Sequence, residues 1–127
     1  MNINIEFFNG KLIDSIKGGV YRISVRNKNR TKSLYIGESF SIIIRCATHL
    51  YSLQNNPNYF GFTSDTIENQ EYTLIFEILK LEANTSQRKK YEKSFISQYN
   101  PILQSGISDR MKSIDEKIQS LEAFLNS

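Results

Sequence analysis

The chain has little of the chemistry that stabilises small secreted or metal-bound domains. Of its 127 residues only Cys46 is a cysteine and only His49 a histidine. One thiol excludes an internal disulfide and any zinc site built on two or more thiolates, and a single histidine argues against structural zinc. No apolar run approaches the roughly 18 to 20 residues that cross a bilayer, and no basic-then-apolar leader opens the sequence. We therefore expect a cytoplasmic protein without membrane contact.

The composition is that of one globular domain. Hydrophobic residues make up 39% and charged residues 23% of the chain, close to ordinary usage. The net charge of +3 is modest, but the segment between Asp14 and Glu38 carries no acidic residue. Its cations could contact phosphates or could simply keep an exposed hairpin solvated. The predicted DNA-binding residues within it are Arg22, Arg26, Lys28, Arg30 and Lys32.

Periodicity predicts alternating strands and helices. Residues 2–16 suggest a short hairpin, or a strand followed by a tight turn at Asn9-Gly10. Residues 20–25, 33–36 and 72–79 have the β-branched and aromatic content of strands, and the first two are expected to pair antiparallel. Residues 41–53 and 86–99 predict helices, the second ending before Pro101. Residues 55–70 read as a loop with one short helical turn.

The helix at 41–53 has a broad apolar arc and a polar arc. Arg45 and His49 are four residues apart, so they leave one face of the helix together, on its polar arc. An arginine fork can hold two phosphate oxygens, and a histidine exchanges protons near neutrality. Taken alone, an arginine or a histidine on a polar arc is more often simply a solvated side chain.

Glu92 falls inside the apolar arc of the helix at 86–99. A buried carboxylate without a partner costs several kcal/mol, so a cation must compensate it. Arg88, one turn earlier, could form a structural salt bridge with Glu92. Alternatively, Glu92 could be an oxygen ligand for Mg²⁺, which commonly takes only one or two protein carboxylates.

The order Gly19-Val20-Tyr21, Tyr35-Ile36-Gly37, Arg45, His49, Glu92 resembles the signature of the GIY-YIG nuclease family, from about residue 17 to residue 105. The resemblance implies an α/β (α+β) fold with a small three-stranded antiparallel sheet flanked by helices. It also implies a metal-dependent endonuclease that hydrolyses DNA with Mg²⁺ or Mn²⁺ held by Glu92. The implied catalytic residues are Tyr21, Tyr35, Arg45, His49 and Glu92.

The end of the resemblance departs from the family pattern. Members often have an asparagine three residues after a proline, whereas here Gln104 follows Pro101. Gln104 offers the same amide on a longer arm, and Asn100 is a weaker substitute, so both are candidate site-orienting residues. Strand alternation raises another question, because it suggests that one of Tyr21 and Tyr35 faces the core and the other does not, unless the strand register reconciles them.

The C-terminal region predicts a separate amphipathic helix. Apolar residues recur four and three apart, a heptad stripe that either docks on the core or pairs with a second copy in a homodimer. Its positions are Ile107, Met111, Ile114, Ile118, Leu121 and Leu125. We therefore divide the chain into a nuclease-like region, 1–106, and this helix, 107–127. With no appended DNA-binding domain evident, a free-standing restriction-, homing- or phage-type nuclease is expected. The alternatives are a catalytically inactive DNA-binding or interaction module with the same fold, and an interaction protein organised by the C-terminal helix.

Overall fold

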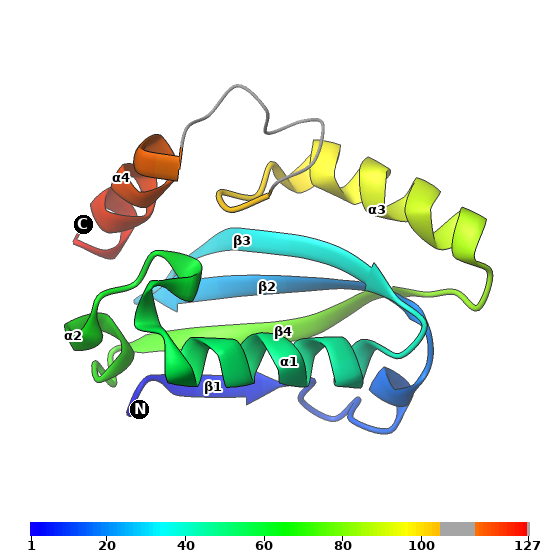
Figure 1. Ribbon diagram of the computed structural model, residues 1–127, viewed down its shortest axis with the longest axis horizontal. Helices are drawn as coiled ribbons and strands as arrows, with labels where there is room; N and C mark the ends of the chain where they lie inside the picture. The colour runs from blue at the N-terminus through cyan, green and yellow to red at the C-terminus, as the bar shows by residue number, and fades with distance from the viewer. Residues whose placement is uncertain (105–113, 127) are drawn as a thin grey trace.

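The computed structural model describes residues 1–104 and 114–126, and its fold is α+β (Figure 1). The strands are β1 (Asn4–Phe7), β2 (Gly19–Asn27), β3 (Arg30–Ser39) and β4 (Tyr72–Leu81). The α-helices are α1 (Ile42–Asn55), α2 (Ser64–Ile67), α3 (Thr85–Tyr99) and α4 (Ile114–Leu125). Two 3-10 helices, η1 (Asp14–Ile16) and η2 (Pro57–Phe60), lie in the connections. Within the described residues no helix is both long and apolar enough to cross a membrane.

The sheet is mixed rather than purely antiparallel. Its order is β1-β4-β2-β3, and β2 pairs antiparallel with both β3 and β4, as predicted for the three longer strands. The prediction of only three strands is wrong, because β1 adds a fourth, parallel to β4. No hairpin forms after β1. Phe8 and Gly10 have φ values of 55° and 71°, so the chain turns away from the sheet and enters η1.

The hairpin of β2 and β3 is longer than predicted. Pairing continues to Asn27 and Arg30, so most of the basic connection is strand and only Lys28 and Asn29 form the turn. Lys28 has a φ of 60° there. The polar composition of this segment suggested a loop, but polar residues are compatible with a strand whose hydrogen bonds are made and of which one face lies in solvent.

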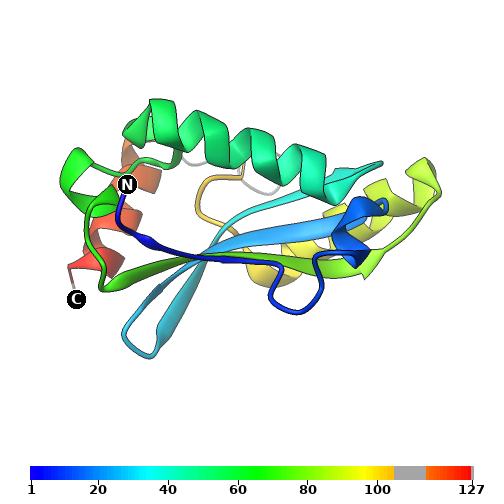
Figure 2. The same cartoon turned by 90° about the horizontal axis from the view of Figure 1, so that it is seen from below.

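Two helices cover opposite faces of the sheet, as Figure 2 shows from below. α1 packs on the face that carries Tyr21, Ile23 and Val25, together with most of the buried core. α3 packs on the other face, where Ile96 contacts a smaller cluster with Val20 and Ile36. β3 is an edge strand of the sheet, and α3 lies beside its outer edge.

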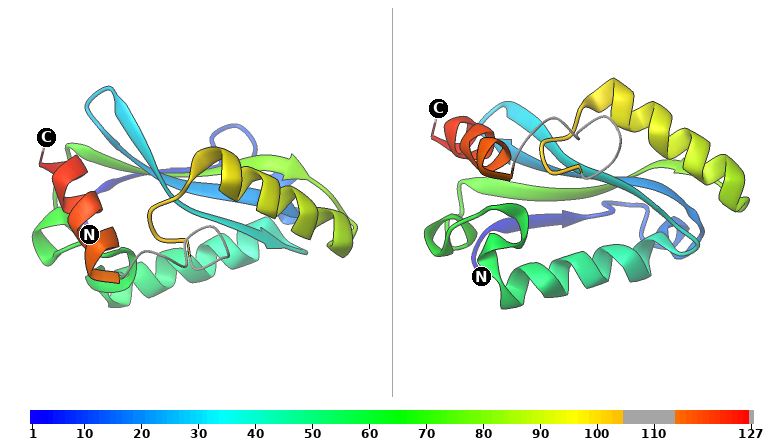
Figure 3. Two further views of the ribbon diagram at one scale, coloured as in Figure 1. Left: turned by 90° about the horizontal axis from the view of Figure 1, so that it is seen from above. Right: turned by 45° about the horizontal axis from the view of Figure 1, so that its top comes forward.

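α4 docks on the core of its own chain, at the end of the sheet near the β2–β3 turn (Figure 3). Leu121 and Leu125 are buried, and Asn27 Nδ2 donates to the Leu125 carbonyl at 3.0 Å. The Tyr72 hydroxyl donates to the same carbonyl at 2.9 Å. The first two positions of the predicted heptad stripe lie outside the described residues. Docking is thus the arrangement in the structure, and dimerisation through this helix stays a prediction.

Candidate active site

Strand register places both signature tyrosines on one face. Tyr21 lies opposite Gly37, and Tyr35 lies opposite Ile23, so all four residues point toward α1. The ring centroids of Tyr21 and Tyr35 are 6.2 Å apart. Tyr21 is fully buried and Tyr35 half-buried. Strand register thus reconciles the two tyrosines, although alternation within each strand suggests opposite faces.

The glycine of each signature string is explained by close packing. A Cβ on Gly37 would lie 2.6 Å from Cζ of Tyr21 and 2.9 Å from Cε1 of Tyr35. A Cβ on Gly19 would collide with the Lys80 carbonyl of the neighbouring strand. Only a residue without a side chain lets the two tyrosine rings lie against the strand.

His49 is buried, with 3% of its surface exposed, so its expected place on a polar, solvated arc is wrong. Its Nε2 is hydrogen-bonded to the Tyr21 hydroxyl at 2.8 Å, and its ring centroid lies 5.2 Å from that of Tyr35. Conversely, Ile44 and Tyr51 are exposed, although helical periodicity places both on the apolar arc of this helix. Burial, and secondarily the charge of Arg45, lower the pKa of His49 to about 4, so the ring is neutral at pH 7.

Arg45 lines a cavity of about 240 Å³ together with Tyr35, His49, Tyr59, Phe60 and Leu103. Burial raises the pKa of both Tyr21 and Tyr35, and the Arg45 guanidinium acts in the opposite direction on both. Arg45 itself is exposed. A cation that faces two phenols and an open cavity is suited to an anionic ligand.

Tyr59 belongs to this site although the sequence analysis did not select it. Its hydroxyl is hydrogen-bonded to His49 Nδ1 at 2.8 Å, so both ring nitrogens of the histidine have a tyrosine partner. η2 holds Tyr59 in place: the Asn56 side chain caps this turn, and Pro57 occupies its first position. The Asn-Pro start of a helical turn was the available signal for η2, but nothing in the sequence linked that turn to His49.

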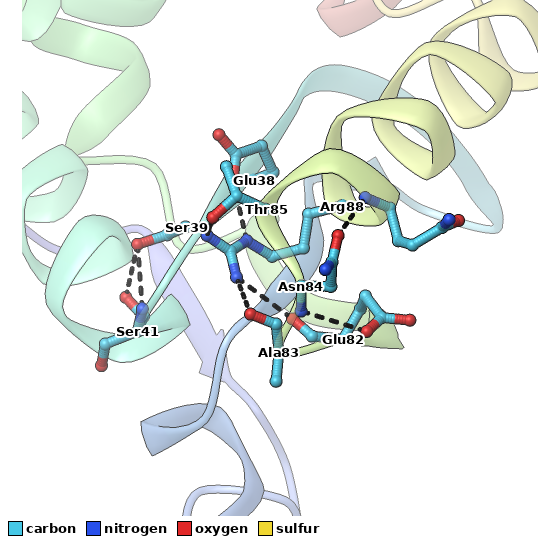
Figure 4. A network of polar contacts seen from close by, with 9 residues as sticks. Glu38, Ser39, Ser41, Glu82, Ala83, Asn84, Thr85 and Arg88 are labelled. Atoms are coloured by element: carbon cyan, nitrogen blue, oxygen red, sulfur yellow. Dashed lines mark hydrogen bonds and ion pairs between the residues drawn. The ribbon is translucent and has the colours of Figure 1, made fainter.

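Arg88 does not pair with Glu92, so that structural interpretation of Glu92 is wrong. Figure 4 shows the guanidinium of Arg88 between the end of β3 and the start of α3. Its Nε donates to Glu38 at 2.9 Å, and its other nitrogens donate to the Ala83 carbonyl at 2.7 Å and the Thr85 hydroxyl at 3.0 Å. This network fixes α3 against the sheet one turn before Glu92.

Glu92 has the electrostatic environment of a cation ligand. Among the described residues it takes part in no ion pair within 4.0 Å, and burial followed by the charge of Glu38 raises its pKa. Lys89, Lys93 and the backbone of Glu38 act in the opposite direction. The Glu92 charge also raises the pKa of Tyr35, so α3 and α1 act on the same tyrosine.

The donor set fits a hard cation. Magnesium needs only one or two carboxylates and completes its shell with water; Glu92 would be its carboxylate ligand, since Glu38 is bonded to Arg88. The part of the chain that the structure describes contains no group of three histidine, cysteine or acidic side chains placed to bind a metal together.

Gln104 and Asn100 have different positions. Gln104 is buried, and its Oε1 accepts from the amide of Ile36 at 2.7 Å, between Tyr35 and Gly37 of the second string. The amides of Ile102 and Leu103 donate to β3 as well. Gln104 thus supports the strand that carries Tyr35. Asn100 caps α3 in the left-handed conformation, with φ 48° and ψ 61°, and its side chain is exposed.

The basic hairpin is less free to bind DNA than its composition suggests. Arg22 pairs with Glu77, Arg26 with Glu6 at 3.0 Å, and Arg30 donates to the Phe124 carbonyl at 3.3 Å. Lys28 and Lys32 are exposed near the hairpin tip. On α3, Lys89 and Lys93 are exposed on either side of Glu92, and the sequence analysis did not select them.

A larger groove of about 690 Å³ runs along β4, away from these residues. Its wall is formed by β4 residues 75–81 and by five residues of the N-terminal segment, namely Glu6, Phe8, Asn9, Lys11 and Asp14. No predicted catalytic residue lines it, so size alone does not identify the site.

Comparisons with protein-family models, with curated proteins and with solved structures found no match to this chain. The function of the protein is therefore inferred from its site.

Proposed function

We propose that the protein is a metal-dependent endonuclease that hydrolyses DNA phosphodiester bonds. The observation that carries the proposal is that Tyr35, Arg45 and His49 line one cavity, while Tyr21 is hydrogen-bonded to His49 behind its wall. Glu92 approaches Tyr35 from a fourth element. The order of these residues along the chain resembles a nuclease signature, and their spatial convergence is what such a site requires.

In this proposal each side chain has one role. Arg45 binds the nonbridging oxygens of the scissile phosphate and stabilises the charge that gathers on them. Tyr21, hydrogen-bonded to His49, takes the proton of the attacking water, and Tyr35 orients that water. Glu92 would hold a magnesium or manganese ion, which would supply charge neutralisation at the phosphate when bound.

Arg45 acts on Tyr21 as well as on the phosphate. Tyr21 is fully buried in the free protein, and the guanidinium of Arg45 is its cationic neighbour. Arg45 is exposed and has a long, rotatable side chain. It can therefore contact a bound phosphate while its charge lowers the pKa of Tyr21.

The test is cleavage of supercoiled plasmid with magnesium and with chelator, comparing wild type with Arg45→Gln. We expect cleavage only with the metal, and a loss of about 10²- to 10³-fold in rate for the variant, because one charge-stabilising donor is removed. Lys11→Gln, in the groove along β4 away from the site, is the charge-matched control and should retain most of the activity. Folded wild type that binds DNA but leaves plasmid, single-stranded and branched DNA intact would favour the inactive binding module.

The lysines of α3 are expected to contact phosphates next to the scissile bond, because they flank Glu92. Lys89→Gln/Lys93→Gln should weaken DNA binding and lower the slope of log affinity against log salt by about two. The matched variant Lys28→Gln/Lys32→Gln, at the hairpin tip, should have a smaller effect on both. Fluorescence anisotropy over a salt series measures both the affinity and its salt dependence. If the hairpin variant had the larger effect, the DNA-binding surface would lie on β2 and β3 instead.

A further inference from the structure

Three side chains form a continuous chain of hydrogen bonds through the site. The Tyr21 hydroxyl lies 2.8 Å from His49 Nε2, and the Tyr59 hydroxyl lies 2.8 Å from Nδ1 of the same ring. The two ends differ in environment: Tyr21 is fully buried, whereas Tyr59 is 41% exposed. The chain therefore connects a buried hydroxyl with the surface through one imidazole.

An imidazole is suited to transfer between two hydroxyls. In its neutral form one ring nitrogen carries a proton and the other accepts one, and a hydroxyl can do both at once. His49 is neutral at pH 7, because burial and Arg45 lower its pKa. It can take a proton at one nitrogen while it releases the proton of the other.

Tyr21 cannot act as a base by itself. Burial raises its pKa, followed by the effects of Tyr35 and Cys46, so the phenolate is not populated near neutrality. If Tyr21 is to accept a proton from water, its own proton must leave in the same step. The hydrogen-bonded acceptor is His49 Nε2.

We propose that Tyr21, His49 and Tyr59 form a proton relay, and that Tyr59 is the positioning residue through which the proton leaves the site. The inference rests on the proposed nuclease function. The proton of the attacking water passes to the Tyr21 oxygen, while its oxygen forms the bond to phosphorus and the bond to the 3′ oxygen breaks. The Tyr21 proton passes to Nε2, the Nδ1 proton to the Tyr59 oxygen, and the Tyr59 proton to bulk water.

This direction requires the resting tautomer with the proton on Nδ1. The groups that face His49 are Tyr21 from β2, Tyr35 from β3, Arg45 from its own helix and Tyr59 from η2, with Phe60 and Leu103 completing the wall. None of these groups is anionic near neutrality. No neighbour in this set therefore favours imidazolium, and a proton that reaches Nε2 displaces the one on Nδ1. A proton returning by the same path restores the resting tautomer, and the Tyr21 proton that it displaces passes to the leaving 3′ oxygen.

Kinetics of Tyr59→Phe provide the first test. The substitution removes one hydroxyl and retains a ring that contacts Phe60, with centroids 4.9 Å apart. We expect kcat to fall by about 10²-fold with KM unchanged, because one step of general base catalysis is impaired. The loss in kcat should become smaller at higher pH, because hydroxide can then accept the proton that Tyr59 would otherwise release to bulk water. Tyr51→Phe, which alters an exposed tyrosine of α1, should match wild type.

Nitrogen-15 spectra of His49 provide a test that needs no cleavage, since this is the only histidine of the chain. Wild type should show the Nδ1–H tautomer, and Tyr59→Phe should lower its share. The relay is overturned if wild type is in the Nε2–H tautomer, or if the variant changes neither the spectrum nor the pH profile. A wild type that cleaves no DNA overturns the nuclease instead, and the spectra still decide the relay.

Discussion

Glu92→Gln should abolish magnesium-dependent cleavage, with a fall in rate of about 10³-fold or more. A carboxamide is nearly isosteric with the carboxylate, but it has no anionic oxygen to hold a metal ion at the phosphate. Plasmid cleavage over a magnesium series measures the effect. Glu71→Gln removes one exposed carboxylate elsewhere and should leave the rate unchanged.

The same substitution should make the protein more stable at pH 7. Burial and Glu38 raise the pKa of Glu92 in the folded state, so the folded state binds its proton more tightly than the unfolded state does. The contribution of Glu92 to stability is therefore greatest below the pKa of its unfolded state, about 4.5, and falls as the pH rises through the pKa of its folded state. Glutamine removes this penalty. Urea unfolding should show the variant to be more stable at pH 7 and nearly equal to wild type below pH 4.

Magnesium should offset part of the destabilisation that the charged Glu92 causes in wild type at pH 7, because an ion that binds only the folded state stabilises that state. The midpoint of thermal unfolding should therefore rise with magnesium in wild type and not in Glu92→Gln. If the variant is less stable at pH 7, or responds to magnesium as wild type does, Glu92 is a structural residue and the metal lies elsewhere.

Arg88→Met should lower the free energy of unfolding by about 3–5 kcal/mol, the range for breaking a buried ion pair from one side. Arg88 is 5% exposed, and its substitution leaves the Glu38 carboxylate and the Ala83 carbonyl without their donor. The free energy of unfolding of a typical domain is about 5–15 kcal/mol, so this variant would be close to unfolding. Denaturant unfolding by circular dichroism measures the loss.

Two further variants separate the causes. Arg88→Lys retains the charge but not the planar fork, so it should recover only part of the stability. Glu38→Gln/Arg88→Met removes both charges and should be more stable than Arg88→Met alone, because no carboxylate is left unpaired. A loss below 1 kcal/mol for Arg88→Met would contradict the role of this network in fixing α3.

Local pattern determined the elements that carry the site. Periodicity placed β2, β3, β4, α1 and α3 within a few residues of their observed ends, since alternation and helical spacing are properties of a short stretch of chain. The order of Tyr21, Tyr35, Arg45, His49 and Glu92 selected residues that the fold brings together. The strand alternative for residues 2–16 is confirmed by β1, but its parallel pairing with β4 was not predicted, because alternation over four residues does not show the partner strand.

Only the tertiary structure decided how these elements meet. Which face Tyr35 takes depends on its register with Ile23, and the burial of His49 depends on two hydroxyls from other elements. Arg88 bonds Glu38 on a neighbouring strand rather than Glu92 on its own helix. These contacts join residues from 10 to 50 positions apart, and short-range pattern carries no information on such pairs. The sequence alone therefore specified most of the strands and helices and the candidate site residues, while strand register and long-range hydrogen bonds specified the burial and partners of those residues.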